Sequence, residues 1–216
     1  FLLDFYLNTF SVLAKTHGIL IDAGSIYITE GGFVKNRRYL FSETGAVAGM
    51  QDKLYLHSFE RSAGVKAGSR LTPAQTRMGL LALLSRSAAE NYEPFAIAAA
   101  MGCTLAVLAA SPFDATDVSF LARCRAWEHR LCIAASGLSI GSDFKKSLDL
   151  RGGIYVPFET GRKQNRPPSA DEKETHVYTR CFTSRIDPVR AAEHFDLYAS
   201  DKNPRFFSEL LKPSEQ

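Results

Sequence analysis

Three short apolar runs, separated by helix-like segments, constrain the fold of this 216-residue chain more than any other feature. The runs are residues 78–84 (MGLLALL), 104–109 (TLAVLA) and 131–136 (LCIAAS). The segments between them, 88–101 and 112–130, are long enough to form helices. Strands that are apolar throughout are buried on both faces, which is typical of parallel strands joined by helices. The sequence therefore predicts an α/β fold with βαβ units.

The part of the chain before these runs predicts a helix followed by antiparallel strands. Residues 5–16 carry apolar side chains at helical spacing, and Gly18 is placed to end that helix. Residues 19–28 and 33–41 predict a hairpin around a Thr-Glu-Gly-Gly turn. Gly24, inside the first of these strands, indicates a close approach of another backbone.

The remaining segments are assigned from the same patterns. Residues 48–57 are expected to be extended and 57–75 irregular, because the latter contain glycines, a proline and mixed charge. After residue 137 we expect antiparallel strands at 144–148 and 153–158, an exposed polar loop at 161–175, a closing strand at 177–186 and a short helix that starts at Asp187.

Composition excludes several classes of protein. A hydrophobic content of 45% and a charged content of 23% are typical of one globular domain, here residues 1–216 with a C-terminal tail at 195–216. A net charge of +3 is too small to indicate a nucleic-acid partner, and the chain has no apolar run long enough to span a membrane. The four cysteines lack the spacing of metal ligands, so we expect free buried thiols, no metal, no cofactor and a cytoplasmic location.

Several segments, in this order, resemble the nitrilase or carbon–nitrogen hydrolase superfamily. They are the hairpin ILIDAGSIYITEGGFVKNRRYLF, the segment DKLYLHSFERSAGVKAGSRL, the strand RMGLLALL, the helix and strand FLARCRAWEHRLCIAASG, and VYTRCFTSRIDPVRAAEH. The resemblance covers about residues 7 to 193 and implies an αββα sandwich with mixed sheets. It also implies that the portion of that fold before the first helix is missing from this sequence.

The resemblance implies a chemistry of three groups. A cysteine thiolate attacks a nitrile or amide carbon, a glutamate moves protons, and a lysine ammonium stabilises the oxyanion. By motif match the lysine is Lys53. Glu60 matches a second carboxylate that some members place after the lysine, although a solvated loop glutamate is the alternative. The general-base glutamate is expected upstream of residue 1.

The position of the nucleophile holds no cysteine. Counting from Gly79 along the strand places the family cysteine at Leu83, and aligning on Glu90 to Pro94 places it at Ala88. Neither side chain can form a thioester. Ser85 and Ser87 lie nearby, but a serine hydroxyl needs an activating base.

The sequence thus predicts a nitrilase-like protein that is catalytically impaired. The alternative is an active hydrolase of an amide, nitrile or carbamoyl group that uses an unexpected nucleophile. The resemblance further implies a homodimer or higher homo-oligomer, with residues 114–130 and the apolar tail as candidate contacts. A small amide-like molecule is the expected ligand, and we expect Lys53 to lie close to the turn after Leu84.

Overall fold

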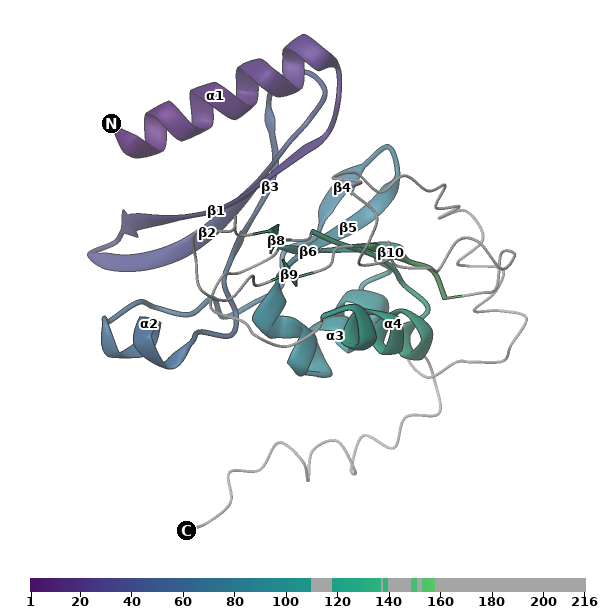
Figure 1. The fold of residues 1–216 in the computed structure, drawn as a ribbon. Helices are drawn as coiled ribbons and strands as arrows, with labels where there is room; N and C mark the ends of the chain where they lie inside the picture. The colour runs from purple at the N-terminus through teal and green to yellow at the C-terminus, as the bar shows by residue number, and fades with distance from the viewer. Residues whose placement is uncertain (110–117, 137, 140–148, 151–152, 158–216) are drawn as a thin grey trace.

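Four layers stack in the order helix, sheet, sheet, helix (Figure 1). The structure is a computed structural model that describes residues 1–109, 118–136, 138–139, 149–150 and 153–157. The helix α1 (Leu2–His17) covers the outer face of the first sheet, and α3 (Glu93–Ala100) and α4 (Val118–His129) cover that of the second. The predicted αββα sandwich is therefore the architecture of the chain.

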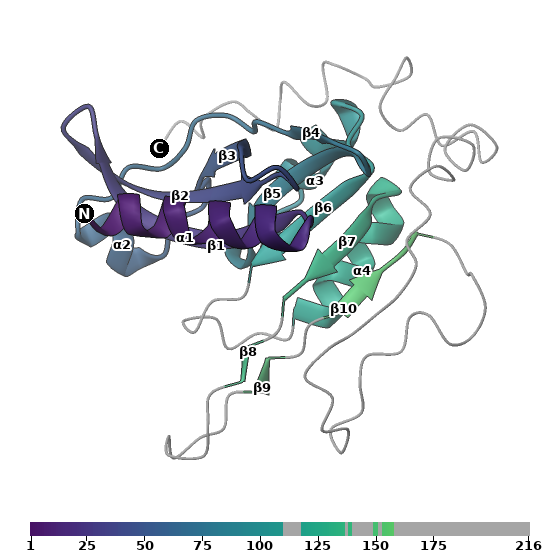
Figure 2. The same ribbon diagram turned by 90° about the horizontal axis from the view of Figure 1, so that it is seen from above.

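The first sheet is antiparallel and has the order β1-β2-β3. Its strands are β1 (Ile21–Glu30), β2 (Phe33–Phe41) and β3 (Val47–Asp52). Seen from above, α1 lies across β1 and β2 (Figure 2). A bulge interrupts the pairing of β1 between Asp22 and Ser25, and Gly24 adopts a φ of 75° there. Gly24 therefore serves the backbone of the bulge, and the predicted close approach is wrong because no atom lies within 4 Å of an added Cβ.

The second sheet is mixed and contains the three apolar runs. Its order is β10-β7-β6-β5-β4, and the central pairs β5–β6 and β6–β7 are parallel. The outer strands β4 and β10 pair antiparallel to their neighbours. The bounds are β4 (Ala74–Thr76), β5 (Gly79–Ser85), β6 (Leu105–Ala109), β7 (Cys132–Ala135) and β10 (Gly153–Tyr155), and β8 (Leu138–Ser139) pairs separately with β9 (Asp149–Leu150).

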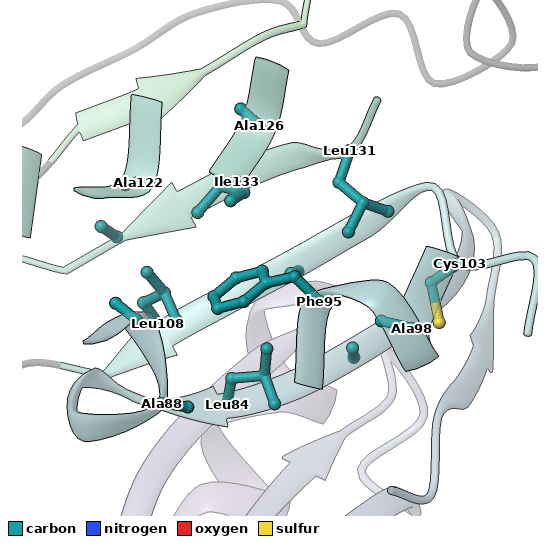
Figure 3. Packing of buried hydrophobic residues seen from close by; sticks show 14 of the residues in the cluster. Leu84, Ala88, Phe95, Ala98, Cys103, Leu108, Ala122, Ala126, Leu131 and Ile133 are labelled. Carbon is teal, nitrogen blue, oxygen red and sulfur yellow. The ribbon is translucent and has the colours of Figure 1, made fainter. Parts of the chain in front are cut away.

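Each pair of adjacent layers encloses a hydrophobic core. Tyr39 and Phe41 of β2 pack under α1, whereas Leu40 points to the other face and packs against the second sheet. The largest core lies between the second sheet and its helices. Figure 3 shows Phe95 of α3 in the middle of that core, with Leu84 and Leu108 from the strands around it. Alternation along β2 therefore decides which side chains enter the space between the sheets.

Three segments differ from the sequence-based prediction. The helix expected at 88–101 is divided into a 3-10 helix, η1 (Arg86–Glu90), and α3, which begins just before Pro94. The region expected to be irregular contains the strand β4 and a short helix, α2 (Ser58–Ser62). The extended segment expected at 48–57 ends as a strand at Asp52. The predicted strands at 144–148 and 177–186, the loop at 161–175, the helix from Asp187 and the tail lie outside the described residues.

Candidate functional site

A cavity of about 300 Å³ opens between the two sheets at the carboxyl ends of β5 and β6. The middle of β1 and β2, the end of β3, α2 and the chain from Leu83 to Ala88 form its walls. The residues that the resemblance singles out, Lys53, Glu60, Leu83 and Ala88, all line it. Segments distant in the sequence thus meet in one place that is large enough for a small molecule.

Lys53 and Glu60 form a buried ion pair in this cavity. Lys53 Nζ lies 2.7 Å from Glu60 Oε2, and the two side chains are 10% and 1% exposed. The alternative that Glu60 is a solvated loop residue is therefore wrong. Because each charge is buried, removal of either one would leave the other without compensation.

The carboxylate of Glu60 accepts hydrogen bonds from four groups. Besides Lys53, the hydroxyl of Tyr27 and Nδ2 of Asn36 each donate to Oε1 at 2.9 Å. The backbone N–H of His57 donates to Oε2 at 2.8 Å. Burial raises the pKa of Glu60, but these donors outweigh burial and lower the pKa to about 2. Glu60 is consequently a fixed anion that positions Lys53, and it is too weak a base to take a proton near neutral pH.

A short helix holds Glu60 in place. α2 begins after His57, whose side chain accepts the backbone N–H of Glu60 while the Glu60 carboxylate accepts the N–H of His57. This reciprocal arrangement is a capping box with histidine in the capping position. Histidine is not among the usual capping residues, which explains why the sequence did not predict this helix.

Hydrocarbon side chains occupy both candidate positions for the nucleophile. Leu83 lies on β5, faces the first sheet and has no exposed surface. Ala88 lies in η1 and is 1% exposed. Neither has an atom that can attack a carbonyl or nitrile carbon.

Two serines lie beside Leu83, and their hydroxyls form a chain. The Oγ atoms of Ser85 and Ser87 are 3.0 Å apart, and Ser87 donates to the carbonyl oxygen of Tyr55 at 2.9 Å. The segment after Lys53 therefore contacts the turn after β5. Since the hydroxyl of Ser87 is committed to Tyr55, Ser85 donates to Ser87, and the chain ends on a carbonyl that cannot remove a proton.

None of the cysteines in the described part of the chain lines the cavity. Cys103 and Cys124 do not form disulfides, whereas Cys132 is disulfide-bonded. The prediction of a free thiol at Cys132 is therefore wrong, because spacing along the chain does not reveal which cysteines meet in space. Cys181 lies outside the described residues. Within those residues there is also no cluster of three or more metal-binding side chains, and no helix is long and apolar enough to cross a membrane.

Sequence reasoning missed Tyr27, Asn36 and Arg38. Arg38 is 4% exposed and donates through Nε to Asp22 at 2.6 Å, and its Nη2 reaches the other carboxylate oxygen of Asp22. Its Nη1 donates to the carbonyl oxygens of Leu84 and Val107 in the second sheet. Asn36 and Arg38 are two positions apart in a strand, so both side chains lie on the same face, and the next residue on that face is apolar. Polar residues on a strand face that continues with an apolar residue are the signal that could have identified them.

The comparisons with known proteins agree with this geometry. The structure is similar to yeast (Saccharomyces cerevisiae) Nit3, a member of branch 10 of the nitrilase superfamily, with a TM-score of 0.60 and 19% identity over 70% of this chain and 57% of Nit3. It is also similar to a carbon–nitrogen hydrolase from Helicobacter pylori, with a TM-score of 0.74 and 18% identity over 96% of this chain and 75% of the other. The chain has the nitrilase fold. The predicted resemblance is thus confirmed at the level of the fold.

Further relatives extend the comparison. A mutant of the amidase of Nesterenkonia sp. AN1 is also similar, with a TM-score of 0.59 and 20% identity over 74% of this chain and 60% of the other. That structure shows covalent addition of the acetamide moiety of fluoroacetamide at the active-site cysteine of the amidase. A probable hydrolase of Bacillus subtilis, YhcX, is 28% identical over 169 residues, or 73% of this chain and 32% of YhcX. The chain thus spans about a third of the length of that relative. No family model matches the sequence.

Proposed function

We propose that this chain binds a small amide-like molecule in the cavity between its sheets and does not hydrolyse it by a thiol mechanism. One observation carries the proposal: the fully buried side chain of Leu83 lies in the cavity that contains the Lys53 ammonium. Carbon–nitrogen hydrolysis in this superfamily needs a thiolate there, because only a covalent intermediate divides the reaction into two accessible steps. A leucine supplies no such intermediate.

The other parts of the cavity favour binding. The ammonium of Lys53 is a donor for a ligand carbonyl, and Glu60 keeps that ammonium in place. Arg38, which Asp22 holds in place, adds a polar side chain to walls that also contain apolar side chains such as Leu83 and Leu84. The alternative, hydrolysis through an unexpected nucleophile, requires Ser85, whose hydroxyl chain leads to a backbone carbonyl instead of a base.

Labelling with fluoroacetamide tests the proposal. A thiolate displaces fluoride from the CH₂ carbon of this probe and forms a stable thioether, so the mass of the intact protein reports on a nucleophile in the cavity. We expect no cavity adduct on the natural chain and one adduct at residue 83 of Leu83→Cys. The matched control is Leu81→Cys, because Leu81 lies two residues earlier on the same strand face but does not line the cavity.

Two results would contradict the proposal. One is the release of ammonia by the natural chain from a panel of simple amides and nitriles. The other is an adduct on the natural chain at any residue that lines the cavity. A lack of labelling in Leu83→Cys, with the fold intact, would show that the cavity does not admit an acetamide group.

We also propose that the chain forms a homodimer through its outer helix layer, as the resemblance to the superfamily implies. Large apolar side chains are exposed on that layer, including Phe120 at 67% and Trp127 at 53% on α4. Phe120 and Trp127 are seven residues apart on the helix and therefore share one face. Their burial against a second copy would remove this apolar surface from water.

A further inference from the structure

A half-exposed aromatic ring lies at the mouth of the cavity. Tyr27 belongs to β1, the outer strand of the first sheet, and pairs directly with Asn36 of β2. Directly paired residues of an antiparallel sheet share a face, so Tyr27 points to the side on which Arg38 reaches the second sheet. Tyr27 lines the cavity and is nevertheless 48% exposed, whereas Asn36 is 8% exposed. The cavity therefore opens to solvent along β1.

The bulge in β1 leaves free space at this opening. Gly24 and Ser25, which border the bulge, line the cavity together with Tyr27. No atom lies within 4 Å of the position that a Cβ on Gly24 would take. A ligand that is longer than the buried part of the cavity can therefore continue outward along this edge of the sheet.

A hydrogen bond inside the cavity holds the ring in place. The Tyr27 hydroxyl donates to Glu60 Oε1 at 2.9 Å, and Glu60 is 1% exposed. No ring of the described residues stacks on Tyr27, whereas Phe59, a second half-exposed aromatic side chain of the cavity, stacks on His57 with ring centroids 5.5 Å apart. Because the motion of the Tyr27 side chain is already restricted, stacking of a ligand on it costs little conformational entropy.

We propose that Tyr27 is a stacking platform that selects ligands with a flat aromatic group at the end nearest the mouth of the cavity. Two aromatic rings gain a quadrupole interaction that a saturated ring of similar size does not provide. Lys53 and Tyr27 bind the two oxygens of one carboxylate, that of Glu60, so a short ligand can extend from the inner wall to the ring. This inference rests on the proposed binding function and adds the class of group that occupies the mouth.

Three amides test the role of the ring. Phenylacetamide and cyclohexylacetamide carry rings of similar size on the same amide, acetamide carries none, and NMR titration measures each dissociation constant. Stacking should make phenylacetamide bind roughly twofold to tenfold more tightly than cyclohexylacetamide. The signals of the Tyr27 ring protons should also shift with phenylacetamide, because they enter the ring current of the bound phenyl group, and should shift much less with cyclohexylacetamide.

Three variants separate the ring from the hydroxyl. Tyr27→Leu should lose the preference for phenylacetamide, whereas Tyr27→Phe should keep it, because only the hydroxyl is removed. Phe33→Leu is the matched control: Phe33 is an aromatic residue of the same sheet with 49% exposure, but it does not line the cavity. This control should keep the preference of the natural chain.

Equal affinity of the natural chain for the two ring compounds, with acetamide bound, would overturn the inference while the proposed function stands. An unchanged preference in Tyr27→Leu, which a merely structural role of Tyr27 predicts, would also overturn it, as would loss of the preference in Tyr27→Phe. The ring-proton shifts need no variant, so their absence would overturn the inference even if Tyr27→Leu does not fold. Failure of all three amides to bind would overturn the proposed function and this inference with it.

Discussion

Replacement of Glu60 by glutamine should destabilise the fold by an amount that depends on pH. The carboxylate is 1% exposed and accepts four hydrogen bonds, one of them from a buried ammonium. Removing one member of a buried ion pair costs about 3–5 kcal/mol, because the other charge is left uncompensated. The glutamine oxygen can still accept hydrogen bonds, so we expect a loss of about 3 kcal/mol at pH 7.

The pKa of Glu60 gives a second route to the same magnitude. Hydrogen bonds lower this pKa from its ordinary value of 4.5 to about 2 in spite of burial. Each pKa unit corresponds to about 1.36 kcal/mol, so the ionised carboxylate stabilises the fold by about 3 kcal/mol. Since the folded-state pKa is the lower one, this contribution is fully present above pH 4.5. It is lost as the pH falls toward 2.

Urea unfolding followed by circular dichroism, at several pH values between 7 and 2, measures the effect. The difference in free energy of unfolding between the natural chain and Glu60→Gln should be largest at pH 7 and should shrink below pH 4.5. Other acidic groups are common to both proteins and cancel in the difference. Glu128→Gln is the control, because Glu128 pairs with Arg125 at the surface and is 45% exposed; it should change stability by less than about 1 kcal/mol. A difference for Glu60→Gln that is equally small, or that does not vary with pH, would refute the reasoning.

Two further predictions concern the core and the outer helices. Phe95→Ala should lower the free energy of unfolding in urea by about 3–5 kcal/mol, because Phe95 has no exposed surface and fills the centre of its core (Figure 3). Phe5→Ala, at a residue of α1 that is 64% exposed, should lower it far less. Equal losses in the two variants would contradict the packing argument. Trp127→Glu should convert the proposed homodimer to a monomer in sedimentation experiments, whereas an unchanged mass would exclude α4 as the contact.

The sequence predicted the layers of this fold because its strongest patterns are local. β2 and β6 lie close to the predicted 33–41 and 104–109, since each is an apolar or alternating run bounded by glycine or polar turns. α2 was missed because its first turn depends on an unusual histidine cap. The break between η1 and α3 was missed although Pro94 is favoured in the first turn of a helix and indicates a new start there.

The site was predictable only in part, for a different reason. The resemblance identified Lys53, Glu60 and Leu83 as site positions, and they share one cavity. Their catalytic roles remain predictions. Asn36 and Tyr27 were not identified, because their partner Glu60 lies on a helix that local patterns did not reveal. Contacts between distant segments leave no periodic signal in a single sequence.

The link that Arg38 makes between the sheets has a mechanical consequence. Its guanidinium lies in the wall of the cavity and holds a carboxylate of one sheet and two strand carbonyls of the other. Sliding of one sheet over the other would have to break these charged contacts before any apolar surface separated. The cavity therefore has nearly fixed dimensions, and a ligand of the right shape enters a preformed space at little cost in reorganisation.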